Sequence, residues 1–181
     1  MANQNDLKVK IFADGADIES IKKLYAQPNI KGFTTNPTLM RQAGIQDYKA
    51  FALEVLKIVT DRPVSFEVFA DDFPTMERQA IEISSWGKNV NVKIPVTNTK
   101  GEFCGALVKK LSDAGVQVNV TALMTLEQVQ RVSDALNPNT PALISVFAGI
   151  KSVGFKFSCN GHGSCVDTRN KIDSIVVPSF S

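Results

Sequence analysis

The strongest constraint on this chain is a regular alternation of short apolar segments with longer amphipathic ones, which runs from residue 9 to residue 149. The short segments have the length and valine content of strands, and the longer ones have apolar residues at helical spacing. The expected strands cover residues 9–14, 32–36, 63–69, 89–95, 116–121 and 142–147. About six βα units in tandem predict an α/β fold, in which helices cover a parallel sheet.

Local signals support the boundaries of the expected helices. Asp17 is a suitable N-cap for a helix that ends near Tyr25, and Pro74 suits the first turn of the helix that follows Asp72. Residues 125–128 fit the Ser/Thr-x-x-Glu/Gln capping box. The spacing of the strands suits a doubly wound sheet or a (β/α)8 barrel. Because no glycine-rich phosphate-binding motif follows any expected strand, a nucleotide-binding version is disfavoured.

Composition excludes several classes of protein. Hydrophobic residues make up 44% and charged residues 21% of the 181 residues, which is typical of a globular chain. No apolar run approaches the ~20 residues that cross a bilayer, and the first residues lack the basic and apolar regions of a signal peptide. The net charge of +2 is too small to indicate a nucleic-acid-binding face. We therefore expect a cytoplasmic protein without a membrane or nucleic-acid partner.

The expected strands carry polar side chains on one face. Alternate residues of a strand face opposite sides, so the valines around Lys93 face the helices and Lys93 faces the other way. In a closed barrel that other face is the interior, and the carboxyl ends of the strands carry the active site. A single buried ion can be a structural pair, but burying several is costly, so their convergence favours an active site. The polar set comprises Glu67, Lys93, Asn119, Thr121 and Ser145, with Asp14 and Asn36 at the ends of the first two strands.

A lysine in such a place indicates carbonyl chemistry. Burial disfavours the ammonium form of a lysine and frees the amine to attack a ketone. The resulting Schiff base accepts electrons when a neighbouring carbon–carbon bond breaks. Carboxylates such as Asp14 and Glu67 can move the protons. We expect this chemistry to need neither a cofactor nor a metal ion.

Four segments resemble the motifs of one known family. They are residues 32–38 (GFTTNPT), 91–97 (NVKIPVT), 118–121 (VNVT) and 144–149 (ISVFAG). With these segments in this order, the chain resembles the transaldolase family, in the short branch that also includes fructose-6-phosphate aldolases. The resemblance implies a (β/α)8 TIM-barrel fold of the class I aldolase type, with a Schiff-base lysine on the fourth strand.

The resemblance also implies roles for individual residues. Lys93 matches the Schiff-base lysine, and Asp14 matches the acid/base residue that handles the proton of the substrate hydroxyl. Glu67 and Thr121 match the residues that hold a catalytic water. The residues that match hydrogen-bonding partners of the dihydroxyacetone moiety are Asn36, Asn119 and Ser145.

The implied reaction moves a dihydroxyacetone unit between sugar phosphates in the pentose phosphate pathway. Sedoheptulose 7-phosphate and glyceraldehyde 3-phosphate would give erythrose 4-phosphate and fructose 6-phosphate. The aldolases of the same branch resemble a pattern with Gln at position 67 and Tyr at position 147. This chain has Glu67 and Phe147, as transaldolases do, so transaldolase is preferred and fructose-6-phosphate aldolase is the alternative.

The resemblance stops at residue 150. After the sixth strand the family continues with an arginine that binds the substrate phosphate, whereas this chain has Ile150. A (β/α)8 barrel usually takes ~250 residues, and no counterpart of two further βα units follows. We therefore expect an incomplete barrel over residues 1–149 and an atypical tail over residues 150–181. A truncated, non-catalytic remnant of the family is an alternative interpretation. The chain could also form a homo-oligomer.

The tail also contains a cluster of three side chains that can bind metals. Cys159, His162 and Cys165 fall within seven residues. A closed structural zinc site usually has four ligands, so we do not predict a metal site here. Residues 150–181 as a whole hold the entire net positive charge of the chain.

Overall fold

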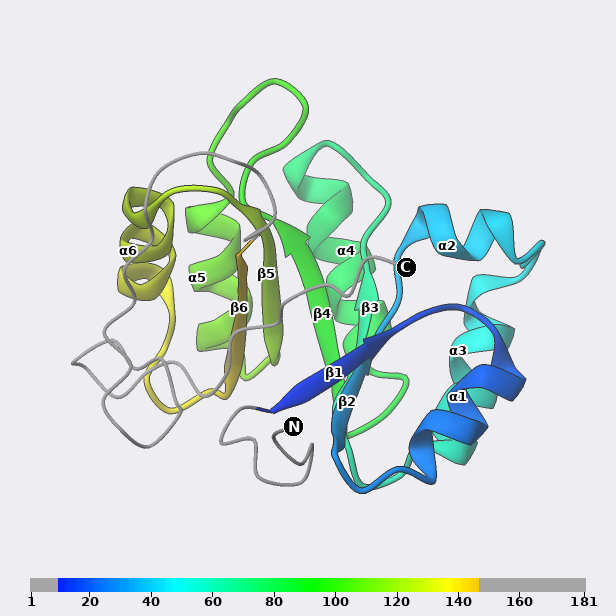
Figure 1. Ribbon diagram of the computed structural model, residues 1–181. Coiled ribbons are helices and arrows are strands. Elements are labelled where there is room, and N and C mark those ends of the chain that lie inside the picture. The colour runs from blue at the N-terminus through cyan, green and yellow to red at the C-terminus, as the bar shows by residue number, and fades with distance from the viewer. Residues whose placement is uncertain (1–9, 147–181) are drawn as a thin grey trace.

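The computed structural model describes residues 10–146, and all the elements below lie in that range (Figure 1). Six parallel strands form one sheet in the order β1-β2-β3-β4-β5-β6, so each strand pairs with its neighbours in the sequence. The strands are β1 (Ile11–Asp14), β2 (Ile30–Thr34), β3 (Val64–Glu67), β4 (Val90–Pro95), β5 (Val118–Leu123) and β6 (Ala142–Val146). The helices are α1 (Ile18–Tyr25), α2 (Pro37–Gln42), α3 (Tyr48–Ile58), α4 (Phe73–Ser84), α5 (Gly105–Asp113) and α6 (Leu126–Ala135).

This architecture confirms the predicted α/β class and the six parallel βα units of an incomplete barrel. Within the described residues, β1 and β6 are the two edges of the sheet. None of the helices in this part of the chain is both long and apolar enough to cross a membrane.

Several helices begin where the sequence signals predict. The Asp17 carboxylate accepts a hydrogen bond from the Ser20 amide at the start of α1, and Asp72 caps α4. Thr125 and Gln128 make both hydrogen bonds of the capping box at α6. These side chains satisfy amide groups that have no partner within the first turn of a helix.

Several boundaries differ from the prediction by a few residues, as in β5, which covers Val118–Leu123 where residues 116–121 were expected, and two of the differences have a clear local cause. The second strand ends at Thr34, because Asn36 is the N-cap of the short helix α2 and Pro37 occupies its first turn. The helix expected over residues 101–114 begins only at Gly105. Ahead of it, the Asn98 side chain accepts hydrogen bonds from the amides of Lys100 and Glu102 and holds a turn.

The valine rows of the strands pack against the helices, as predicted. Val92, Ile94 and Val120 are completely buried and belong to the main hydrophobic core together with Val108 and Leu111 of α5. Figure 1 shows the helices on the outside of the curved sheet. The opposite side chains of the same strands therefore lie on the concave face.

The sheet curves far enough for its two edge strands to meet through side chains. Phe12 of β1 and Leu143 of β6 form a small buried cluster, although their strands are not neighbours in the sheet. The Phe12 ring fills the space above Gly32, where an added Cβ would lie 2.2 Å from Phe12 Cε1. Phe12 and Leu143 are the second residues of their strands, so they form an apolar floor at the amino-terminal end of the concave face.

Candidate active site

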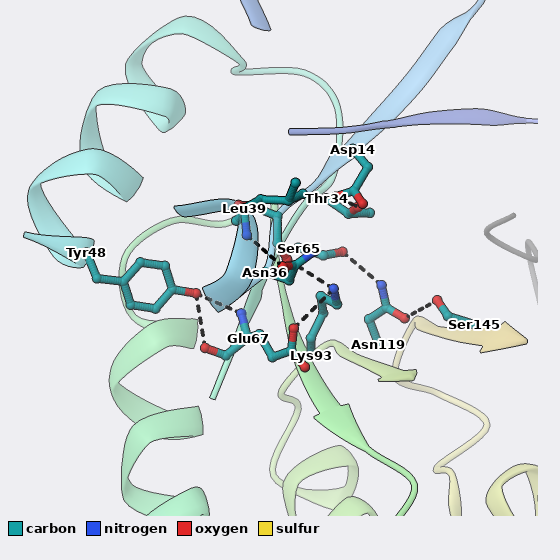
Figure 2. A network of polar contacts seen from close by, with 11 residues as sticks. Asp14, Thr34, Asn36, Leu39, Tyr48, Ser65, Glu67, Lys93, Asn119 and Ser145 are labelled. Carbon is teal, nitrogen blue, oxygen red and sulfur yellow. Dashed lines mark hydrogen bonds and ion pairs between the residues drawn. The ribbon is translucent and has the colours of Figure 1, made fainter. Parts of the chain in front are cut away.

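Polar side chains of one parity meet on the concave face towards the carboxyl ends of the strands (Figure 2). Asp14 and Glu67 are the last residues of β1 and β3. Glu67 is the register partner of Lys93, and Lys93 is the register partner of Asn119. Since paired residues in parallel strands point to the same face, three neighbouring strands bring these three side chains side by side.

Lys93 makes two polar contacts with other residues in the range 10–146. Its Nζ lies 3.3 Å from Oε2 of Glu67 and donates a hydrogen bond of 3.0 Å to the carbonyl oxygen of Thr35. Lys93 is only 9% exposed. A charge in such a place is stable only when it is paired and hydrogen-bonded, and here the carboxylate and the carbonyl supply both.

Asn119 links three strands across the concave face. Its Nδ2 donates to Ser65 Oγ at 3.0 Å, and its Oδ1 accepts from Ser145 Oγ at 2.7 Å. Asn119 is completely buried. Because β3 and β5 are separated by β4 in the sheet, the bond to Ser65 passes across β4 and ties the curved sheet together.

Asp14 and Asn36 lie at the ends of the first two strands. Oδ1 of Asp14 accepts a hydrogen bond of 2.9 Å from Thr34 Oγ1. Oδ1 of Asn36 accepts from the Leu39 amide at 3.0 Å, as the N-cap of α2. The cap explains why this asparagine suits its position whatever else it binds, and its contact with a substrate stays a prediction.

The strand β5 is irregular beside Thr121. Its register with β6 shifts between Val120 and Leu123, and Ala122 has a φ of 63°. A left-handed conformation is uncommon for alanine, and irregularities of this kind often re-aim a side chain next to an active site. Thr121 itself is 9% exposed. Its role in holding a water stays a prediction.

Sequence reasoning did not single out four groups that contact the predicted residues, and one of them is the Thr34 hydroxyl, which bonds Asp14. Ser65 has the same parity as Glu67, so the alternation in β3 would have been enough to find it. The carbonyl of Thr35 and the hydroxyl of Tyr48, which bonds the backbone of Glu67, have no such signal, because both contacts depend on tertiary packing. The predictions made for Phe147, Ile150, Cys159, His162 and Cys165 lie outside the described residues.

A parallel βα sheet in which a buried lysine pairs with a part-buried carboxylate towards the carboxyl ends of the strands has the arrangement found in (β/α)8-barrel enzymes. Residues 11–154 match the family model described as Transaldolase/Fructose-6-phosphate aldolase, and the chain belongs to this family.

Curated relatives agree with this assignment. The chain is 40% identical over 120 residues to a probable transaldolase of Dehalococcoides mccartyi, with 66% of this chain and 54% of that protein covered. A probable transaldolase of Streptococcus agalactiae serotype V is 40% identical over 120 residues, which cover 66% of this chain and 53% of that protein. The chain thus spans about half the length of the curated relatives it matches.

Among solved structures, a dihydrodipicolinate synthase from Rhodopseudomonas palustris is similar in fold, and the alignment covers 77% of this chain and 44% of the synthase chain. The TM-score is 0.41 and the sequence identity is 20%.

Proposed function

We propose that this chain carries Schiff-base chemistry of the transaldolase type, which moves a dihydroxyacetone unit from one sugar phosphate to another. The observation that carries the proposal is Lys93, buried on the concave face with the Glu67 carboxylate 3.3 Å from its Nζ. The family resemblance supplies the substrates: sedoheptulose 7-phosphate and fructose 6-phosphate as donors, with aldose phosphates as acceptors. The proposed setting is the pentose phosphate pathway in the cytoplasm.

The first steps form the covalent bond. Glu67 takes a proton from the Lys93 ammonium group, directly or through a water held with Thr121. The free amine attacks the ketone carbon of the donor and a C–N bond forms. The carbonyl oxygen then leaves as water, with one proton from the attacking amine and the other returned by Glu67. The product of these steps is a protonated Schiff base between Lys93 and the donor.

Carbon–carbon cleavage follows. Asp14, which Thr34 orients through a hydrogen bond of 2.9 Å, takes the proton of the hydroxyl next to the bond that breaks. The electron pair of that bond moves into the Schiff base, and the aldose product departs. The remaining enamine attacks the acceptor aldehyde in the reverse of these steps. Asn36, Asn119 and Ser145 hydrogen-bond the dihydroxyacetone moiety in this proposal.

Covalent trapping tests the proposal. The folded chain is incubated with fructose 6-phosphate and borohydride, and its peptides are analysed by mass spectrometry. A reduced dihydroxyacetone adduct is expected on Lys93 and not on Lys109, which is exposed and paired with Asp113. Lys93→Met should abolish the adduct and Lys109→Met should retain it. A folded sample with unlabelled Lys93 would reject the proposed chemistry.

A second candidate is fructose-6-phosphate aldolase, because the family description includes both activities. An aldolase releases free dihydroxyacetone from fructose 6-phosphate without an acceptor, whereas a transaldolase needs erythrose 4-phosphate for turnover. Glu67 favours transfer, since the aldolase pattern has glutamine at this position. Release of dihydroxyacetone at the same rate with and without erythrose 4-phosphate would favour the aldolase.

The third candidate is a non-catalytic remnant of the family. It is motivated by Ile150, which stands where the family has an arginine that binds the substrate phosphate. A folded chain with neither turnover nor an adduct would support this candidate.

A further inference from the structure

The ladder between β2 and β3 stops one step before Glu67. The Phe33 amide donates to the carbonyl oxygen of Pro63 at 2.9 Å, and the Thr35 amide donates to that of Ser65 at 3.1 Å. Partners in a parallel ladder advance by two residues on each strand. The next step would therefore join residue 37 to the carbonyl oxygen of Glu67.

Two features at the end of β2 prevent that step. Residue 37 is proline and has no N–H to donate. The carbonyl oxygen of Thr35, which would accept from the Glu67 amide, accepts from Lys93 Nζ instead. A buried backbone amide or carbonyl without a partner costs about 1–3 kcal/mol, so both groups of Glu67 need another partner.

The hydroxyl of Tyr48 supplies both bonds. It accepts from the Glu67 amide at 2.7 Å and donates to the Glu67 carbonyl oxygen at 3.0 Å (Figure 2). One phenol thus takes the place of the missing ladder step. It does so at the residue whose carboxylate is paired with Lys93.

Aromatic packing fixes the position of the Tyr48 ring. Its centroid lies 4.8 Å from that of Phe69, 5.3 Å from that of Trp86 and 6.1 Å from that of Phe66, each in an edge-to-face arrangement. Burial, with the nearby Glu67 carboxylate as a smaller cause, raises the pKa of Tyr48 above its ordinary value. The hydroxyl therefore keeps its proton and remains a donor at neutral pH.

We propose that Tyr48 is a positioning residue for the reaction centre: by holding both backbone groups of Glu67, it sets the Glu67 carboxylate against Lys93. The inference rests on the proposed function, in which Glu67 moves protons at Lys93. Within the described residues, the polar contacts of Tyr48 are with the backbone of Glu67, so its effect on Lys93 passes through that residue.

The test compares two tyrosine variants. Tyr48→Phe removes the hydroxyl and keeps the ring. The control is Tyr25→Phe, which changes the other tyrosine of the chain, whose hydroxyl donates to the carboxylate of Asp61. The readout is the rate at which formaldehyde and cyanoborohydride methylate Lys93, followed by peptide mass spectrometry.

A freed Lys93 is expected to react faster in Tyr48→Phe, by about threefold to tenfold, which is the effect of losing about one hydrogen bond. In Tyr25→Phe the rate should be unchanged. Equal rates in the two tyrosine variants would overturn the proposal.

A double variant shows whether Tyr48 acts through Glu67. In a Glu67→Gln background, Tyr48→Phe should add no further change to the methylation rate, because the carboxylate that it positions is already gone. Effects that multiply would mean that Tyr48 only supports general packing, and the proposal would be rejected.

Hydrogen exchange gives a second measurement, and its wild-type part does not depend on the variants folding. In the wild type, the Glu67 amide should be as protected as the Val68 amide, which donates to the Lys93 carbonyl at 3.2 Å. In folded Tyr48→Phe, Glu67 should exchange at least about tenfold faster relative to Val68. A wild-type Glu67 amide that exchanges like an unbonded loop amide would refute the double hydrogen bond.

The two proposals can fail separately because methylation needs no sugar phosphate. A Tyr48 effect on Lys93, without any adduct from fructose 6-phosphate, would reject the proposed function and keep the positioning role. An adduct on Lys93 without a Tyr48 effect would support the proposed function and reject the positioning role.

Discussion

Asn119 donates to Ser65 and accepts from Ser145 inside the concave face, so replacing it with alanine breaks two buried hydrogen bonds. Each lost bond costs about 1 kcal/mol, and a hydroxyl left unpaired in a buried place adds a penalty of about the same size. We therefore expect Asn119→Ala to lower the free energy of unfolding by about 2–4 kcal/mol. Asn139→Ala, at an exposed position, should change it by less than about 0.5 kcal/mol.

A double-mutant cycle separates the bridge from the loss of packing. Ser145→Ala and Asn119→Ala each remove the hydrogen bond between these two side chains. The double variant Asn119→Ala/Ser145→Ala loses that bond only once. The loss in the double variant should therefore fall short of the sum of the single losses by about 1 kcal/mol. Urea unfolding is followed by the fluorescence of Trp86, the single tryptophan of the chain. Additive losses, or a loss below about 1 kcal/mol in Asn119→Ala, would refute the bridge.

Three further outcomes can be measured by the same unfolding assay. Gly32→Ala should lower the free energy of unfolding by about 1–3 kcal/mol, because the added Cβ would lie 2.2 Å from a Phe12 ring carbon. Gly15→Ala is the control, since the space around Gly15 is open. Equal urea midpoints for the two variants would contradict this packing. Thr125→Ala should cost about 1 kcal/mol by removing the capping box of α6, and Thr125→Ser should recover most of it; no difference between the two would argue against the cap. Burial raises the pKa of Cys104 from 9.0 to about 11, so the unfolded chain releases this thiol proton first and stability should fall as the pH rises through this interval. Cys104→Ala should flatten that part of the pH profile, and an unchanged slope would refute the assignment.

Parity is a local property of a strand, and for this reason it could be predicted from sequence. The alternation around Lys93 was enough to place that side chain opposite the buried valines, and the same rule placed Asn119 and Ser145. The spacing of the βα units left the order of the strands open between a doubly wound sheet and a barrel, and the family resemblance implied the sequential order that the structure shows. The fold and the face of the candidate site were therefore predictable.

Contacts that depend on tertiary packing could not be predicted from the sequence. The segment around Asn36 and Pro37 was interpreted as the end of a strand, although an N-cap followed by proline is also a typical helix start. The structure shows the helix, and its proline is what interrupts the ladder near Glu67. Tyr48 fills that gap from a different element, 19 residues away in the chain, and no spacing rule connects a helix residue to a strand backbone at that distance.

Phe12 and Leu143 place hydrocarbon at the amino-terminal end of the concave face, whereas Lys93 and Glu67 lie towards the carboxyl ends of the strands. Charges beside material of low dielectric constant interact more strongly than charges surrounded by water, and their field is directed towards the solvated side. In this sheet the opposite end of the concave face is the carboxyl end of the strands, where Asp14 and Glu67 stand. An anion or a strongly polarised carbonyl approaching from that side meets an oriented field before it makes any hydrogen bond. The apolar pair thus gives direction to the electrostatics of a site that it does not touch.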